Sequence, residues 1–219
     1  MVQELGRIER PSSERFAGQR KLFLVPWVYE PPAKARDGLV VVVRFWNQVK
    51  SQVASLESRL GPVQHLYHET VTEGGSQGLK YLEAAAPRSY SFFQQRCQEG
   101  VTLEATEDLE LLLQVQDLQR CLMLPFGSYE VTRRLHEWLT ESTRKRYEHI
   151  AQRLNETLKA GDTGLLIVNE HHQVQFPQDV QVFYVSPPAL DEYRRWLEGW
   201  MEQQRQEAEK GPSEPSQAP

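Results

Sequence analysis

Two short segments of the sequence combine histidine with glutamate, the side chains that most often transfer protons or bind zinc near neutral pH. They are residues 65–69 (HLYHE) and 170–172 (EHH). If the first segment is a strand, alternation places His68 on one face and His65 and Glu69 on the other. The two histidines then cannot share a metal ion without a bend in the strand. We therefore predict neither a metal site nor a bound cofactor.

These segments still favour one catalytic hypothesis, because each follows or ends an apolar stretch that reads as a strand. Ligand-binding groups of α/β folds gather at the carboxyl ends of the strands. The hypothesis is a hydrolase or phosphate-ligand enzyme with His68 as the base, Glu69 or Glu170 as its orienting carboxylate, and His171 or His172 as a ligand contact. The competing interpretation is a solvated loop, because adjacent side chains point in different directions.

Three tryptophans in helix-like segments favour a different hypothesis, and we rank it first. Trp138 lies in a long helical stretch, and Trp196 and Trp200 lie in the last one. Aromatic side chains beyond those needed for a core often anchor protein interfaces. The sequence therefore indicates a non-catalytic protein-binding or regulatory module, with another protein or a second copy of the chain as its partner.

Other motifs have simpler structural interpretations. Residues 72–78 (TEGGSQG) lack the lysine and the spacing of a phosphate-binding loop, which favours a surface turn. The arginines and lysine between 133 and 153 alternate with glutamates three or four residues away, a pattern typical of ion pairs on a solvated helix face. Cys121 lies near Arg120 and Asp117 without an adjacent histidine, so we expect a thiol packed between helices.

Composition excludes several classes of protein. The formal net charge is -5, which opposes nucleic-acid binding because such proteins usually carry a basic excess. Two cysteines are too few for a disulfide framework or a cysteine-based zinc site. The opening residues have no apolar core, and no stretch approaches the roughly 20 apolar residues that span a bilayer. We therefore expect a cytoplasmic protein without an export signal or membrane anchor.

Apolar patterning predicts the elements that must position these residues. Short apolar stretches typical of strands lie at 22–29, 63–68, 101–104, 163–168 and 180–185. Apolar residues at helical spacing lie at about 42–60, 79–85, 89–99, 107–123, 129–160 and 187–201. The first helix could begin later than residue 43, because residues 39–43 are also typical of a strand. Pro26 suggests that the first strand is an edge strand or contains a bulge.

This alternation predicts an α/β fold with a mainly parallel or mixed sheet of about four to five strands covered by helices. A helical insertion at about 106–161 and a C-terminal helix complete it. We predict a disordered leader at 1–19, a single domain at 20–202 and a disordered polar tail at 203–219. Strand order stays open, and the strands at 163–168 and 180–185 could be antiparallel neighbours because their connection is short.

Overall fold

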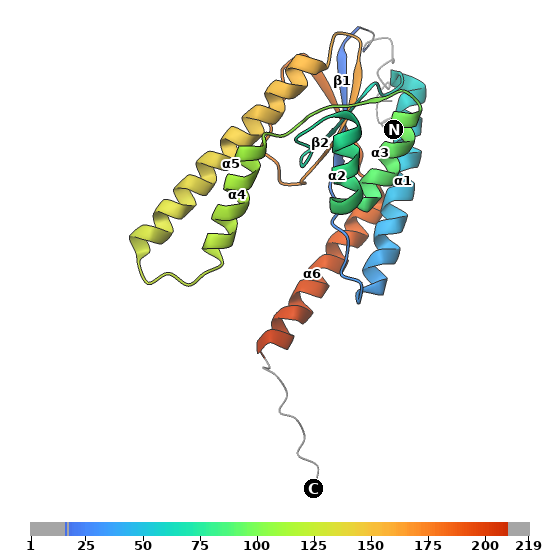
Figure 1. Ribbon diagram of the computed structural model, residues 1–219. Coiled ribbons are helices and arrows are strands. Elements are labelled where there is room, and N and C mark those ends of the chain that lie inside the picture. The colour runs from blue at the N-terminus through green and yellow to red at the C-terminus, as the bar shows by residue number, and fades with distance from the viewer. Residues whose placement is uncertain (1–15, 17, 210–219) are drawn as a thin grey trace, which may run out of the picture.

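The computed structural model describes residue 16 and residues 18–209 of the chain. It contains a five-stranded sheet with helices on both faces (Figure 1). The strands are β1 (Arg20–Pro26), β2 (His65–His68), β3 (Thr102–Leu103), β4 (Thr163–Val168) and β5 (Val180–Tyr184). The helices are α1 (Arg36–Leu60), α2 (Gly75–Ala85), α3 (Pro87–Gln98), α4 (Leu109–Leu122), α5 (Tyr129–Thr157) and α6 (Pro188–Glu209).

All four strand pairings are parallel, and the strand order is β3-β2-β4-β1-β5. The predicted α/β fold, with its helical insertion and C-terminal helix, is confirmed. β4 and β5 are not antiparallel neighbours, because both pair in parallel with β1, which lies between them. β1 is therefore not an edge strand. Pro26 is its last residue, where the missing N–H group interrupts no ladder inside the strand.

Each face of the sheet has its own apolar core, which explains why the strands are continuous apolar runs. Phe23 and Val25 of β1 point to the face covered by α1, α2, α3 and α6. Leu22 and Leu24 point to the opposite face, where the C-terminal half of α5 contributes Ile150 and Leu154. The helix that packs on this second face also forms the long hairpin described next.

α4 and the first part of α5 form an antiparallel hairpin that projects from the sheet (Figure 1). Asp108 caps α4 by accepting a hydrogen bond from the Leu111 N–H at 2.9 Å. Ser128 caps α5 in the same way through the Val131 N–H. Short polar side chains at these positions satisfy amide groups that a helix leaves unpaired. The caps fix where the hairpin begins and where it turns.

The ends of the domain differ in one respect from the prediction. α6 continues to Glu209, so residues 203–209 of the predicted disordered tail are helical. Residues 210–219 and most of the predicted leader at 1–19 lie outside the described residues. In the described part of the chain, every helix is too short or too polar to cross a bilayer.

The topology marks one place on the sheet where α/β proteins usually bind ligands. β1 and β4 are neighbours, yet the chain leaves β1 toward β2 and leaves β4 toward β5, on opposite sides of the pair. In α/β folds, ligands often bind outside the carboxyl ends of two strands at such a reversal. The segments after β1, β2 and β4 meet at this carboxyl edge.

Candidate functional site

A buried ion cluster occupies the carboxyl edge of the sheet, on the face covered by α5. Arg146 of α5 donates from Nε to the Glu107 carboxylate, and from Nη2 to the Glu69 carbonyl oxygen at 2.7 Å. Nη2 also lies 3.4 Å from Glu69 Oε2. The side chains of Glu69, Glu107 and Arg146 are 3%, 0% and 11% exposed. Three separate segments therefore meet through one guanidinium group.

The cluster contains two carboxyl groups for one guanidinium, and burial penalises the unbalanced charge. Burial raises the pKa of Glu69 to about 7 and that of Glu107 to about 8, although Arg146 opposes both shifts. Burial alone would lower the pKa of Arg146, but the two carboxylates outweigh it and raise that pKa. Glu107 Oε1 has no hydrogen-bond partner among the described residues. These raised pKa values favour a proton on the carboxyl groups of the cluster at neutral pH.

Tyr29 and Asn169 connect the cluster to the carboxyl ends of β1 and β4. The backbone of Asn169 lowers the pKa of the Glu69 carboxyl group, and its side-chain Nδ2 donates to the Tyr29 hydroxyl at 3.2 Å. Asn169 Oδ1 accepts the His171 N–H at 2.8 Å. The ends of β1, β2 and β4 are thereby joined by polar contacts at one edge.

His68 lies on the other face of the sheet, as the strand alternation predicts. Its Nδ1 accepts the Thr70 N–H at 3.3 Å, and its Nε2 lies 3.3 Å from Ser89 Oγ. The rings of Trp27 and Phe93 pack edge-on against it. The side chain is fully buried, and burial lowers its pKa to about 3. His68 is a neutral core histidine that is sealed from solvent.

Glu170 and His171 belong to a third environment. Glu170 pairs with Arg194 of α6, and His171 is exposed. Within residues 16 and 18–209, no hydrogen bond or ion pair joins the side chains of His68, Glu69, Glu170 and His171, and no group of three or more His, Cys, Asp or Glu residues is placed to hold a metal ion. The structure does not bring the four predicted residues to one reaction centre.

A cavity of about 190 Å³ lies at the carboxyl ends of β1, β4 and β5, between the β4–β5 connection and α6. Its polar lining includes Asn169, Glu170, His172, Ser186 and Arg194. Arg194 is already paired with Glu170 and Asp191. The Ala189 N–H at the start of α6 donates to Gln48 Oε1 at 3.0 Å. The charged group and the helix amide that would hold a phosphate are therefore engaged within the protein.

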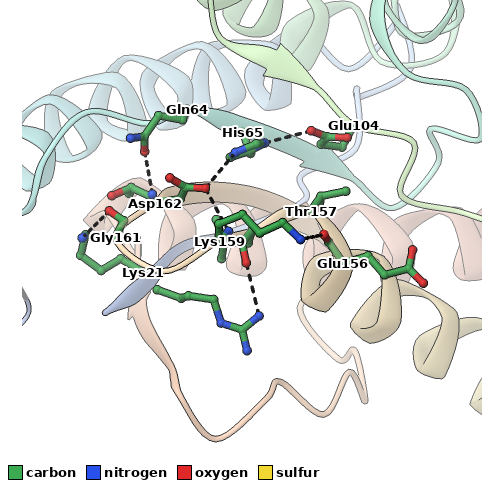
Figure 2. Close-up of polar contacts among 12 residues, drawn as sticks. Lys21, Gln64, His65, Glu104, Glu156, Thr157, Lys159, Gly161 and Asp162 are labelled. Carbon is green, nitrogen blue, oxygen red and sulfur yellow. Dashed lines mark hydrogen bonds and ion pairs between the residues drawn. The ribbon is translucent and has the colours of Figure 1, made fainter. Parts of the chain in front are cut away.

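His65 lies in a polar network at the opposite, amino edge of the sheet. Its Nδ1 lies 2.9 Å from Glu104 Oε1, and its Nε2 lies 3.4 Å from Asp162 Oδ2 (Figure 2). Asp162 also accepts the Lys159 N–H at 2.9 Å. These contacts join the first residue of β2 to the residues that follow β3 and precede β4. Figure 2 shows hydrogen bonds and ion pairs of this network between separate chain segments, which supports a structural role.

The most distinctive surface of the protein is the hairpin, which we call the arm and define as residues 109–145. Its tip, residues 121–129 (CLMLPFGSY), contains no charged residue. Met123, Leu124 and Tyr129 in this tip are 82%, 61% and 83% exposed, and Phe126 is also exposed. Soluble proteins seldom expose contiguous groups of large apolar side chains unless the surface binds something.

The three tryptophans predicted to bind a partner have different surroundings. Trp138 lies on the arm and is 58% exposed. Trp196 packs directly on Gly38 of α1, where no side chain would fit, and its ring stacks on that of Trp200. The Lys34 ammonium group lies 5.2 Å from the centre of the Trp200 ring. Packing on α1 thus accounts for Trp196, and Trp200 lies against Trp196 and Lys34. Trp138 lies in a groove beside α4 and stays largely exposed.

Charged side chains of the arm are paired with one another. Arg133 pairs with both Glu130 and Glu137, and Lys145 pairs with Glu141 at 2.8 Å. Arg144 pairs with Glu148, one turn further along α5. The predicted ion pairs of this helix are present. The exception is Arg146, which the sequence pattern places in the same group and which the structure buries.

One sequence signal could have identified Arg146. It lies four residues before Ile150 and eight before Leu154, on the stripe that packs against the sheet. A charged residue at a stripe position requires a buried partner. Its partners Glu69 and Glu107 are distant in sequence, so no local pattern identifies them.

Comparisons of the chain with protein-family models, with curated proteins and with solved structures find no match.

Proposed function

We propose that this protein is a non-catalytic binding module that holds a partner protein with the apolar tip of its arm. The observation that carries this proposal is the tip itself, where four large apolar side chains are exposed within seven residues, 123–129. The roughly 17 residues of α5 between Tyr129 and Arg146 place the tip about 25 Å from the sheet, at 1.5 Å per residue. With an arm of this length, a partner can bind the tip without contacting the rest of the domain.

The chemistry of the arm favours a partner with an apolar cleft over a polyanion. Because Arg133, Arg144 and Lys145 already have acidic partners on α5, they offer little net positive charge to phosphate groups. The tip carries no charge and supplies aromatic and aliphatic side chains, the types that anchor protein interfaces when they enter a pocket. We expect Met123, Leu124 and Tyr129 to be the anchors.

The first experiment identifies the partner by position. A photo-crosslinking amino acid is introduced at Met123, and in a control protein at Tyr81, an exposed apolar residue on α2. We expect one discrete protein to be crosslinked from position 123 and not from position 81. Crosslinks only to a second copy of the chain would contradict the proposal that the partner is a different protein. Binding of the protein to lipid vesicles in a flotation assay, if it depends on Met123, would also contradict it.

The second experiment measures affinity with the purified partner. Leu124→Glu is expected to weaken binding by about 30-fold or more, which corresponds to roughly 2 kcal/mol for an anchor residue. Tyr81→Glu is the matched control and is expected to leave the Kd unchanged. Since both side chains are exposed, neither change disturbs the core. Equal Kd values for Leu124→Glu and the unchanged protein would overturn the assignment of the tip.

A further inference from the structure

The buried cluster lies where the arm joins the domain. Glu107 lies two residues before α4, and Arg146 directly follows the arm in α5, so their ion pair closes the base of the hairpin. Glu69, at the end of β2, ties this base to the sheet through its carbonyl oxygen. The three-way contact therefore lies where α5 passes from the arm to the half that packs on the sheet.

Among the residues that the structure describes, no second positive charge faces the cluster. The titratable groups that face it are the phenols of Tyr29 and Tyr147 and the carboxylate of Asp108. With both glutamates ionised, the cluster has one uncompensated negative charge, and Glu107 Oε1 has no donor among the described residues. Buried charge without a partner is strongly unfavourable, so this state requires either a proton or the entry of water.

We propose that Glu69, Glu107 and Arg146 form a proton-controlled clamp that sets the angle at which the arm leaves the sheet. A proton on one of the carboxyl groups leaves a balanced pair with Arg146 and keeps the base closed. Loss of that proton makes the two carboxylates repel each other and admits water to the base. The pKa values, about 7 for Glu69 and about 8 for Glu107, place this change near neutral pH.

Other contacts limit the movement to a change of angle. Arg153 Nε donates to the Ala105 carbonyl oxygen at 3.0 Å, and the N–H groups of Thr106 and Glu107 both donate to the Val71 carbonyl oxygen. None of these bonds involves a titrating group. They hold the start of α4 beside α5 and β2 while the ion cluster opens. As a regulator of partner binding, the clamp rests on the proposed function of the tip, whereas its movement is a property of the free protein.

The test measures the arm in the protein alone. Spin labels are attached to Met123→Cys at the tip and Ser51→Cys on α1, after Cys97 and Cys121 are replaced by alanine. We expect the label-to-label distance distribution to differ between about pH 6 and about pH 9, with a midpoint between the two raised pKa values. An identical distribution at both pH values would overturn the clamp, and would leave the partner-binding role of the tip unaffected.

Three variants assign any shift to the cluster. Glu107→Gln mimics the state with one proton, in which the remaining carboxylate balances Arg146, so it should keep the low-pH distribution at both pH values. Glu69→Gln mimics the same state from the other side and provides a second readout if Glu107→Gln folds poorly. Glu110→Gln, at an exposed acid one turn further along the arm, should retain the full shift. A full shift in Glu107→Gln or in Glu69→Gln would contradict the proposal.

Discussion

Arg146→Met is expected to destabilise the protein by about 3–5 kcal/mol at about pH 8, where it leaves two buried carboxylates without their cation. The loss should be smaller at about pH 5, because both carboxyl groups can then take up protons in place of the ion pair. Urea unfolding followed by tryptophan fluorescence measures both values. The reason is local: Arg146 is the only cation that contacts Glu69 or Glu107 among the described residues.

Arg144→Met is the matched control for this experiment. Arg144 lies two residues away on the same helix, is exposed, and pairs with Glu148 on the surface. Surface ion pairs contribute about 0–1 kcal/mol, so this variant should retain nearly full stability. Equal losses for Arg144→Met and Arg146→Met would show that the buried cluster has no special role in folding.

The free energy of unfolding is expected to fall as the pH rises from about 6.5 to about 8, by an amount on the order of a few kcal/mol. A carboxyl group whose pKa is raised on folding stabilises the protein fully below its unfolded pKa, and this contribution is lost as the pH rises through the folded value. Glu69 and Glu107, with folded pKa values of about 7 and about 8 against an ordinary 4.5, therefore act in this window.

The expected fall in the free energy of unfolding begins near pH 6.5 because of His68. Its pKa is lowered from 6.5 to about 3, so the unfolded chain binds the proton more readily and stability falls as the pH drops below 6.5. Below that value the histidine and the two glutamates oppose each other, and above it only the glutamates act. Glu107→Gln should flatten the decline above pH 6.5. A free energy of unfolding that is constant or rises across this window in the unchanged protein would contradict the assignment.

Local sequence patterns predicted the elements well because both faces of the sheet are covered. The apolar runs at 163–168 and 180–185 coincide with β4 and nearly coincide with β5. α1 ends at Leu60, as predicted, and Gly61 follows it with a positive φ angle of 102°. α5 ends at Thr157, three residues before the predicted end at residue 160. α2 begins at Gly75, four residues before the predicted start, since its first turn contains no apolar residue. Composition alone assigns such a turn to a loop.

The strand order and the candidate site depend on contacts between distant residues, which periodicity does not report. β1 separates β4 from β5 although it precedes both by more than a hundred residues. The predicted meeting of His68 with Glu69 fails for a reason that the sequence did contain, because strand alternation sends their side chains to opposite faces. The contact of Glu69 with Arg146 joins residues 77 positions apart. Only the position of Arg146 on an apolar stripe indicated that it was buried.

The central claim is that the tip of the arm binds the partner. Hydrogen-exchange mass spectrometry, with and without the partner identified by crosslinking, tests this claim most directly because it compares the arm and the carboxyl edge in one experiment. The account predicts that the partner slows exchange in residues 118–138, which include the tip and Trp138. It predicts little change in residues 168–172 and 186–194, which include much of the lining of the cavity at the carboxyl ends of β1 and β4. Protection confined to this cavity, with an unchanged tip, would contradict the account and favour a ligand site at the sheet edge.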